Sequence, residues 1–302
     1  MPRSLPSLHL YDAAGSRIFQ RIMELEEYYP TRCEEEILEV HGEAIVAPFL
    51  GRRCTLVDLG AGDGTKTRLL LSHLHRNCPN LRYAPVDISA SALLKSSAEM
   101  SVAFPGLEVA PVAAEYAEGL LWLGTREKSG GAFLVLFLGS NIGNLEHGEA
   151  RRLLVKLREA LRPGDHVLVG FDLLKDLGVL RRAYDDPRGV TAAFNLNLLS
   201  RMNRELQADF DLSAFAHRAT FDPRRPAMES WLESLRDQVV TVAGRRFPFV
   251  ASERIHTEIS CKYREADVTA FARAAGFAEV GHFRDRRSWF LDALWRVPGR
   301  VP

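Results

Sequence analysis

Apolar strand-like runs alternate with helical patterns along the chain from residue 54 onward. The run "GAFLVLFLGS" (131–140) is almost wholly apolar, as a central parallel strand buried on both faces must be. This alternation predicts a parallel α/β sheet. Strands are expected at 54–61, 82–89, 107–115, 131–140 and 166–174, and helices at 67–76, 91–104 and 150–161.

The alternation stops between about residue 175 and residue 262. This segment has a helical pattern over 190–206 and strand-like runs within 224–250, where "AGRR" is expected to form a turn. We therefore expect an insertion of mixed α+β structure.

The α/β pattern returns after the insertion. A helix is expected over 265–277, with Gly276 at its end, and two strands at 278–285 and 288–297 can pair as an antiparallel edge. The chain is therefore expected to be discontinuous in its domains. We predict a nucleotide-binding type of sheet domain from residues 35–174 and 263–302, and a second domain from residues 1–34 and 175–262.

Composition narrows the function classes. The chain has 39 basic and 39 acidic residues, so it lacks the basic excess that nucleic-acid binding requires. No apolar run approaches the roughly 20 residues of a membrane span, and the N-terminus lacks the apolar core of a signal peptide. The four cysteines have no metal-type spacing. We expect a cytoplasmic protein with reduced thiols and no metal, and the sequence is compatible with a monomer.

The first expected strand runs into a glycine-rich loop, "DLGAGDGTKT" (58–67). Gly60 permits a tight turn and Gly62 permits close approach of a ligand to the backbone. A dinucleotide fingerprint would need a third glycine where Thr65 stands, and the negative charge of Asp63 would repel a pyrophosphate. Asp87, at the end of the second strand, can accept both hydroxyls of a ribose. The loop therefore favours S-adenosylmethionine, a nucleoside ligand without phosphates, over a nicotinamide cofactor; a glycine turn without any ligand is the remaining alternative.

Five separated stretches give the chain a family resemblance. They are "YDAAGSRIF" (11–19), "EEYYPTR" (26–32), "FLGSNIGN" (137–144), "RAYDDPRGVTAAFNLNLLSRMNRELQADFDL" (182–212) and "HTEISCKYR" (256–264). In these stretches the chain resembles the histidine Nα-methyltransferases of ergothioneine biosynthesis. The resemblance implies a Rossmann-like class I methyltransferase sheet with an inserted α+β substrate-binding domain. It also implies S-adenosylmethionine as methyl donor and L-histidine as a small-molecule substrate, which is converted to trimethylhistidine (hercynine).

The resemblance also implies roles for individual residues. Tyr28, Asn144 and Tyr184 match residues that hold the amine and carboxylate of the substrate, and these three are the catalytic candidates. Glu258 and Ser260 match the pair that binds the imidazole, and in a strand residues two apart point to the same face. Further matches are Gly139 for the substrate, Tyr11, Gly60, Lys66 and Asp87 for the cofactor, and Glu115 and Tyr116 for its adenine.

Three positions depart from the family pattern. The glycine loop replaces a serine-rich version, Glu115 stands where Asp is expected, and Ser230 stands where Met is expected against the imidazole. Ser230 leaves open a methyltransferase of the same fold that acts on another amino acid, such as an aromatic one. A cofactor-binding protein without turnover is a further alternative, although it has no reason to keep Tyr28, Asn144 and Tyr184. From the sequence alone, Asn144 could also be a helix N-cap, and Asp185 with Asp186 could suggest a metal pair.

Overall fold

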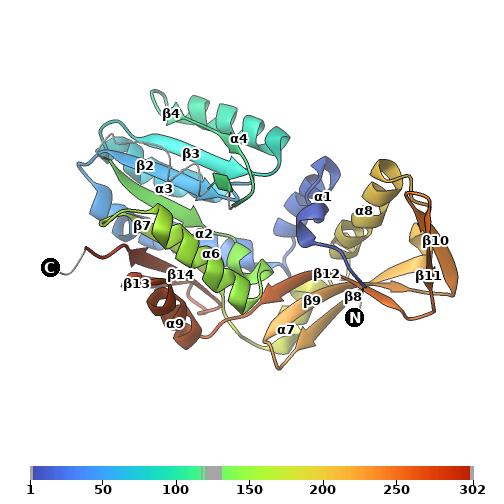
Figure 1. The fold of residues 1–302 in the computed structure, drawn as a ribbon. Coiled ribbons are helices and arrows are strands. Elements are labelled where there is room, and N and C mark those ends of the chain that lie inside the picture. Colours follow the sequence, from blue (N-terminus) through green and yellow to red (C-terminus); the bar gives the residue numbers. More distant parts are fainter. Residues whose placement is uncertain (1–2, 117, 120–130, 300–302) are drawn as a thin grey trace. The chain divides into compact units, whose positions relative to one another are not determined.

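A computed structural model describes residues 3–116, 118–119 and 131–299. The chain divides into two compact units (Figure 1). The eight-stranded unit comprises residues 30–174 and 263–302, and the four-stranded unit comprises residues 1–29 and 175–262. What each unit binds remains a prediction.

The eight-stranded unit is built on one sheet with the strand order β13-β14-β7-β6-β2-β3-β4, in which β5 also pairs with β3. Its strands are β2 (Cys54–Leu59), β3 (Arg82–Asp87), β4 (Glu108–Val109), β5 (Val112–Ala113), β6 (Ala132–Phe137), β7 (His166–Asp172), β13 (Ala278–Arg284) and β14 (Phe290–Arg296). Its helices are α2 (Tyr29–Val46), η2 (Ala47–Phe49), α3 (Thr65–Asn77), α4 (Ala90–Ala103), η3 (Asn141–Asn144), α6 (His147–Ala160) and α9 (Glu265–Ala275).

The strand order confirms the predicted Rossmann-like methyltransferase sheet. The central strand β2 is parallel to β3 on one side and to β6 on the other. The strands that follow β2 directly are added on one side of it and the later strands on the other, so the strand order reverses at β2. The closing strand β14 is antiparallel to both β7 and β13, which confirms the predicted antiparallel pair at this edge. In such sheets ligands bind beyond the carboxyl ends of the strands where the order reverses. The loops after β2 and β6 are therefore the places to look for a site.

The predicted strand over 107–115 is wrong as one element. The structure has two short strands there, β4 paired with Arg82 and Tyr83, and β5 paired with Val86 and Asp87. Pro111 lies between them and has no N–H to donate to the sheet, so the strand is interrupted at that point.

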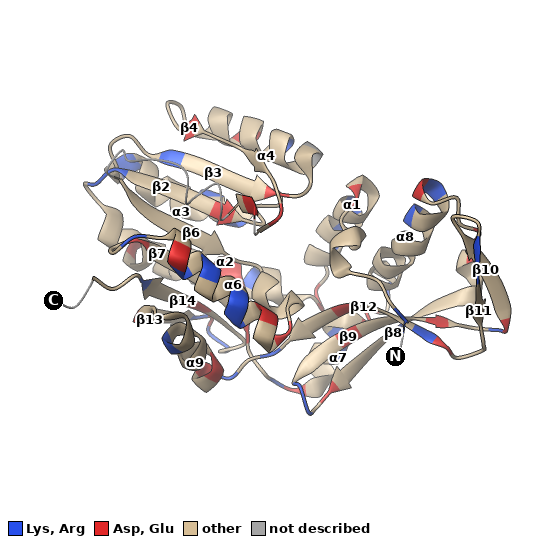
Figure 2. Cartoon of the chain, viewed as in Figure 1, with Lys and Arg blue, Asp and Glu red and all other residues tan. Residues whose placement is uncertain are grey.

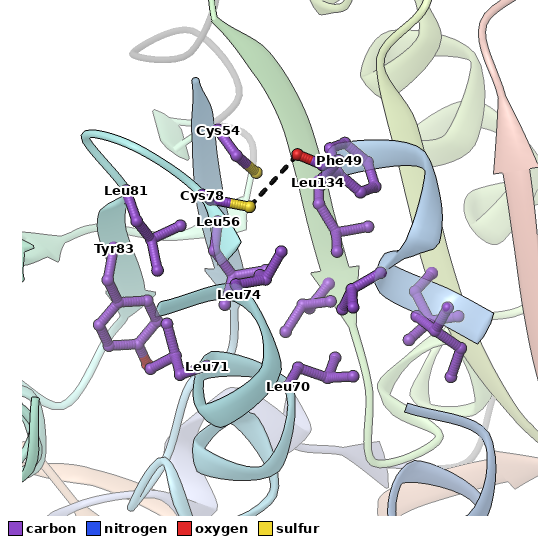
Figure 3. Packing of buried hydrophobic residues seen from close by; sticks show 14 of the residues in the cluster. Phe49, Cys54, Leu56, Leu70, Leu71, Leu74, Cys78, Leu81, Tyr83 and Leu134 are labelled. Atoms are coloured by element: carbon purple, nitrogen blue, oxygen red, sulfur yellow. Dashed lines mark hydrogen bonds between the residues drawn. The ribbon is translucent and has the colours of Figure 1, made fainter. Parts of the chain in front are cut away.

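Helix α3 packs against the sheet and contributes side chains to its hydrophobic core. Leu70, Leu71 and Leu74 recur at helical spacing along α3 and are fully buried in a cluster with Leu56 of β2 and Leu134 of β6 (Figure 3). Burial of each such side chain contributes about 1.5–3 kcal/mol. This packing holds α3, and with it the glycine loop that precedes α3, against β2.

The four-stranded unit contains a sheet with the order β1-β12-β9-β8 and a separate β10-β11 hairpin. Because β1 pairs in parallel with β12, the N-terminal segment and the insertion share one sheet. Its strands are β1 (Arg3–Ser4), β8 (Phe215–Asp222), β9 (Ala227–Ser234), β10 (Gln238–Val242), β11 (Arg245–Phe249) and β12 (Arg254–Cys261). Its helices are η1 (Ser7–Leu10), α1 (Ala13–Met23), α7 (Leu177–Tyr184), α8 (Val190–Glu205) and η4 (Leu212–Ala214).

Local sequence explains how these elements begin and turn. The Asp176 carboxylate accepts the N–H groups of Gly178 and Val179 and so caps α7, which carries Tyr184 at its end. The predicted "AGRR" turn is confirmed: Ala243 and Gly244 both have positive φ between β10 and β11, as a two-residue hairpin turn requires.

Charges of both signs are interspersed along the elements, as on α6 (Figure 2). The four cysteines are free and buried. Within residues 3–116, 118–119 and 131–299, no helix combines the length and the apolar composition that a membrane crossing requires.

Candidate functional site

The glycine loop after β2 makes a close approach that only glycine allows. Gly60 has φ +79°, and a Cβ there would lie 2.7 Å from Nδ2 of Asn141 and 3.0 Å from Oη of Tyr116. The Tyr116 ring packs edge-on against Phe137, with centroids 5.1 Å apart. Burial raises the pKa of Tyr116, so its hydroxyl keeps its proton. The loop therefore brings the predicted cofactor residues Gly60 and Tyr116 together.

Asp87 holds the same loop from the neighbouring strand. Its carboxylate accepts the N–H of Gly62 at 3.0 Å and the N–H of Ser89 at 2.8 Å. Asp63, the acid within the loop, accepts the N–H of Thr65 at 3.0 Å at the start of α3. A carboxylate has about four lone-pair positions, so Asp87 retains capacity to accept from a ligand.

A buried acid beneath the loop was missed by sequence reasoning. Asp58 of β2 is 3% exposed and accepts hydrogen bonds from the hydroxyls of Thr67 and, at 3.2 Å, Tyr83. Burial raises the pKa of Asp58 to about 6, although these hydrogen bonds oppose the rise. These bonds tie the end of β2 to α3 and β3.

Lys66 and Gly139, both predicted site residues, are joined by Glu34 of α2. The fully buried Glu34 carboxylate forms an ion pair with Lys66 and accepts the N–H of Gly139 at 2.8 and 2.9 Å. Burial alone would lower the pKa of the Lys66 ammonium, but the attraction of Glu34 reverses this and raises it. The fully buried Asp292 lies close by, and burial together with the negative charge of Glu34 raises its pKa well above its usual range. No motif in the sequence marks Glu34 or Asp292.

The segment after β6 carries the other predicted polar groups of this unit. Ser140 adopts the left-handed conformation with φ 54°, and Asn144 ends the short helix η3. Asn144 is not the N-cap of α6: that helix begins at His147 after Glu146, whose N–H donates to the carboxylate of Glu149 at 3.2 Å. The alternative of a capping role for Asn144 is therefore wrong.

The four-stranded unit contains a closed cluster of three polar side chains, which we call the hydroxyl–lysine cluster: Tyr184, Ser260 and Lys262. Lys262 Nζ donates to Tyr184 Oη at 2.7 Å and to Ser260 Oγ at 2.8 Å, and the two hydroxyl oxygens lie 2.7 Å apart. His217 of β8 holds the backbone carbonyl of Tyr184 at 2.9 Å. The structure thus joins two predicted substrate residues, and it adds Lys262, which sequence reasoning missed.

Glu258 lies next to this cluster along β12. It pairs across the sheet with Ser230 of β9, after an irregularity of register between His256 and Glu258. Burial raises the pKa of Glu258 to about 7, while the positive charge of Lys262 and a hydrogen bond from Ser230 oppose the rise. The carboxyl group therefore titrates in the same pH range as an imidazole.

Aromatic side chains lie beside the cluster. The Tyr28 ring packs edge-on against Tyr184, with centroids 6.4 Å apart, and against Phe19 at 6.1 Å. Tyr11 packs against Phe19 and Phe194, at 5.5 Å in each case. Tyr11 thus belongs to the four-stranded unit, whereas the other predicted cofactor residues lie in the eight-stranded unit. Its role toward the cofactor remains a prediction.

Two further acidic residues, Glu115 and Asp186, form hydrogen bonds with nearby segments of the chain. Glu115 is exposed, and its backbone N–H donates to Glu118 at 3.4 Å, so its role toward adenine also remains a prediction. Asp186 accepts the N–H groups of Val190 and Thr191 at 3.0 and 2.7 Å and so caps α8. Among the residues that the structure describes, no group of three His, Cys, Asp or Glu could hold a metal ion.

Comparison with known proteins gives consistent results. A family described as "Histidine-specific methyltransferase, SAM-dependent" matches residues 1–297. The chain is 41% identical over 291 residues to a histidine N-alpha-methyltransferase of Mycobacterium tuberculosis, covering 96% of this chain and 89% of the relative. It is 42% identical over 286 residues to the protein of that name from Mycolicibacterium smegmatis, covering 94% and 87%.

One solved structure shows the likeness of fold. A possible exported protein from Bordetella parapertussis superposes with a TM-score of 0.51 at 16% identity, over 98% of this chain and 81% of that chain. At this identity the likeness concerns the fold alone.

Proposed function

The chain belongs to the family of histidine-specific, SAM-dependent methyltransferases, and we propose that it transfers methyl groups from S-adenosylmethionine to the α-amine of L-histidine. The observation that carries the proposal is the match over residues 1–297, together with 41–42% identity to two histidine N-alpha-methyltransferases. We further propose that three successive transfers give trimethylhistidine, as an early step of ergothioneine biosynthesis in the cytoplasm. A relative from Neurospora crassa, 29% identical over 97% of this chain, is named ergothioneine biosynthesis protein 1.

We propose that the eight-stranded unit binds the methyl donor. The loop supports this proposal because Gly60 lets Asn141 and Tyr116 approach the loop backbone closely, and because Asp87 can accept from ribose hydroxyls. No phosphate has to be held there, and Lys66, the nearby cation, is already paired with Glu34. The remaining residues assigned to the donor by family likeness are Tyr11, Glu115 and Tyr116.

We propose that the four-stranded unit binds histidine. Tyr184 and Ser260 present hydroxyl groups from one cluster, and Glu258 can accept the N–H of an imidazole. A site built around a substrate N–H discriminates strongly, because its polar groups stay unpaired with the wrong side chain. Family likeness also assigns Tyr28 of this unit, and Gly139 and Asn144 of the eight-stranded unit, to the amine and carboxylate.

The proposed chemistry requires orientation rather than strong acids or bases. The bound donor supplies an electrophilic methyl group on a sulfonium. The amine must be neutral, and its lone pair forms the new N–C bond while the S–C bond breaks. After the first and second transfers a proton leaves the nitrogen, and the third transfer leaves a quaternary ammonium. Hydroxyl and amide groups such as Tyr28, Tyr184 and Asn144 can orient the amine without placing a charge on it. Proximity and orientation then supply most of the rate.

Mass spectrometry of products from a panel of the twenty amino acids, each incubated with S-adenosylmethionine, tests the proposal. Histidine should be converted to its trimethylated form, and the other amino acids should remain unmodified. Ser230 beside Glu258 supports one second candidate, a methyltransferase for another amino acid such as an aromatic one. Methylation of an aromatic amino acid in preference to histidine would establish that alternative and reject the proposal.

A further inference from the structure

We infer that Lys262 is a positioning residue for substrate binding: its ammonium fixes the positions of the Tyr184 and Ser260 hydroxyl oxygens, so that both ends of the amino acid are read from one rigid cluster. The inference rests on the proposed function of this site, and it adds a residue to which no substrate role has been given above.

The geometry of the cluster is closed. Lys262 is 1% exposed, Ser260 4% and Tyr184 8%, so water does not compete for the three contacts. The three edges measure 2.7, 2.8 and 2.7 Å, and Nζ also lies 4.5 Å from the centroid of the Tyr184 ring. A lysine side chain loses up to about 2 kcal/mol of conformational freedom when it is buried. Hydrogen bonds from a charged donor are strong enough to offset that loss.

Counting hydrogens shows what the ammonium fixes. An ammonium only donates, so the oxygens of Tyr184 and Ser260 must both accept from Lys262. The contact between the two hydroxyls uses one of their two hydrogens. The other hydrogen must point outside the triangle. Either hydroxyl can be the donor in the contact between them, so Lys262 fixes the positions of the two oxygens and not the direction of that bond. Without Lys262, neither oxygen would be held by a charged donor.

The lysine also connects the two halves of the proposed recognition. Glu258, Ser260 and Lys262 stand at every second position of the chain. The positive charge of Lys262 acts on the Glu258 carboxylate as well as on the two hydroxyls. Glu258 and Ser260 are the proposed imidazole partners, and Tyr184 is a proposed partner of the amino-acid end. One buried cation therefore organises groups that contact opposite ends of the substrate.

Lys175 offers a matched control in the same unit. Its Nζ donates to Tyr29 Oη at 2.8 Å and lies 4.1 Å from the centroid of that ring, which is the same pair of contacts that Lys262 makes with Tyr184. We assign Lys175 no part in binding. Lys175→Met therefore removes a lysine–tyrosine contact without disturbing the hydroxyl–lysine cluster.

The test compares steady-state kinetics of Lys262→Met, Lys175→Met and the wild type. Lys262→Met should raise the histidine KM by roughly ten- to a hundredfold, the scale of charged hydrogen bonds. Its affinity for S-adenosylhomocysteine, measured by calorimetry, should stay within about twofold of the wild type. Lys175→Met should leave the histidine KM nearly unchanged. A wild-type KM in Lys262→Met, or equal effects of the two variants, would overturn the inference.

A rescue experiment separates charge from volume. In Lys262→Ala, added n-propylammonium should lower the histidine KM toward the wild-type value, whereas n-butanol, of similar size but neutral, should not. Equal rescue by both compounds would show that Lys262 only fills space, and the inference would fail.

A double-mutant cycle keeps the inference testable if both Lys262 variants fail to fold. Tyr184→Phe and Ser260→Ala leave Lys262 in place. Their combined effect on KM should be clearly smaller than the product of their single effects, because either change opens the same triangle. Multiplicative effects would contradict a shared cluster.

The outcomes also separate this inference from the proposed function. If the wild type methylates an amino acid other than histidine, the proposed function fails, and the same variants are compared with that amino acid. If the wild type methylates histidine and Lys262→Met keeps its KM, only the inference about Lys262 fails.

Discussion

Two carboxylates near the glycine loop of the eight-stranded unit hold backbone, whereas Glu258 of the four-stranded unit faces other side chains. Glu34 and Asp87 accept hydrogen bonds from the N–H groups of Gly139 and Gly62, so these carboxylates fix the shapes of loops. Glu258 instead lies beside the side chains of Ser230 and Lys262. A carboxylate that accepts from backbone N–H groups should therefore matter for folding and for the shape of a cofactor loop. A carboxylate that lies beside other side chains should matter for the choice of substrate.

The largest expected effect is on stability, from Glu34→Ala. Removing a fully buried acid leaves Lys66 without its ion-pair partner and the N–H of Gly139 without its acceptor. The free energy of unfolding, measured with urea, should fall by about 3 kcal/mol or more. Glu36→Ala is the control: Glu36 lies on the same helix and pairs at 2.6 Å with Arg286, whose side chain is 90% exposed, so its loss should matter much less. Equal losses for the two variants would remove the distinction between loop-holding and surface acids.

Glu258→Ala should act chiefly on substrate choice. The histidine KM should rise by about one to two orders of magnitude, the scale of a charged hydrogen bond, with little change in cofactor affinity. Tryptophan should become a better substrate, because no partly buried carboxylate would remain to oppose an apolar ring. The comparison is made by kinetics on both amino acids, with Glu233→Ala as control, since Glu233 pairs with Arg218 and Arg254. If Glu258→Ala keeps the wild-type preference, the imidazole is recognised elsewhere.

Asp87→Ala should weaken binding of S-adenosylmethionine by roughly tenfold or more in calorimetry, because the variant loses the acceptor of the ribose hydroxyls and of the Gly62 N–H that shapes the loop. Asp63→Ala is the control within the same loop, because the hydrogen bond that Asp63 accepts is a local one, from the N–H of Thr65 at 3.0 Å. Its effect should be small. Comparable losses in both variants would indicate that the loop, and not a ribose contact, governs affinity, and binding of NADH in the same assay would support an oxidoreductase.

The smallest effects concern pH. Because the pKa of Glu258 is raised to about 7, its carboxylate is lost as pH falls through 7. The histidine KM should therefore be roughly tenfold higher at pH 6 than at pH 8, relative to the same ratio in Glu258→Gln, which cancels the titration of free histidine. Ser230→Ala removes a hydrogen bond that lowers this pKa, so it should move the midpoint upward and change KM near pH 7 only a few-fold. A profile that matches Glu258→Gln would show that the ionised carboxylate is not required.

The same raised pKa has a consequence for stability with a defined sign. The folded protein binds the proton of the Glu258 carboxyl group more tightly than the unfolded chain does. Protonation of Glu258 therefore adds its full contribution to the free energy of unfolding below the ordinary carboxyl pKa, and this contribution is lost as pH rises through 7. Glu258→Gln should therefore raise the melting temperature relative to the wild type at pH 8, but not near pH 4.

Periodic features of the fold could be predicted from the sequence more readily than interruptions. The strands at the sheet centre were predictable because β6 is a continuous apolar run and β2 is mostly apolar, and the closing pair β13–β14 followed the last helix. Helix α2 was missed because its buried face includes Glu34 and its middle carries Gly42, which obscure the apolar spacing. The break between β4 and β5 does have a signal in the sequence, because Pro111 has no N–H to donate to the sheet.

The candidate site was predictable where a residue belongs to a motif. Gly60 and Asp87 have recognisable positions at strand ends, and Tyr184 and Ser260 follow from family likeness. Lys262 and Asp58 had no such signal, because a charged residue that becomes buried looks the same in a sequence as one that stays in solvent. Only the pairing of strands and helices far apart in the chain shows which charges lose their water.

The pairing of β1 with β12 bears on how the protein can be made. Arg3 lies opposite Ile255, so the first strand of the four-stranded sheet waits for a partner that leaves the ribosome only after most of the chain has been synthesised. Until then its backbone N–H and C=O groups lack the partner strand that they have in the folded sheet, and unpaired strands can recruit foreign ones. Arg3, which also contacts Glu253 and the ring of Phe249, places a charge at this edge. Its charge suits it to discourage misassembly during translation as well as to anchor the finished sheet.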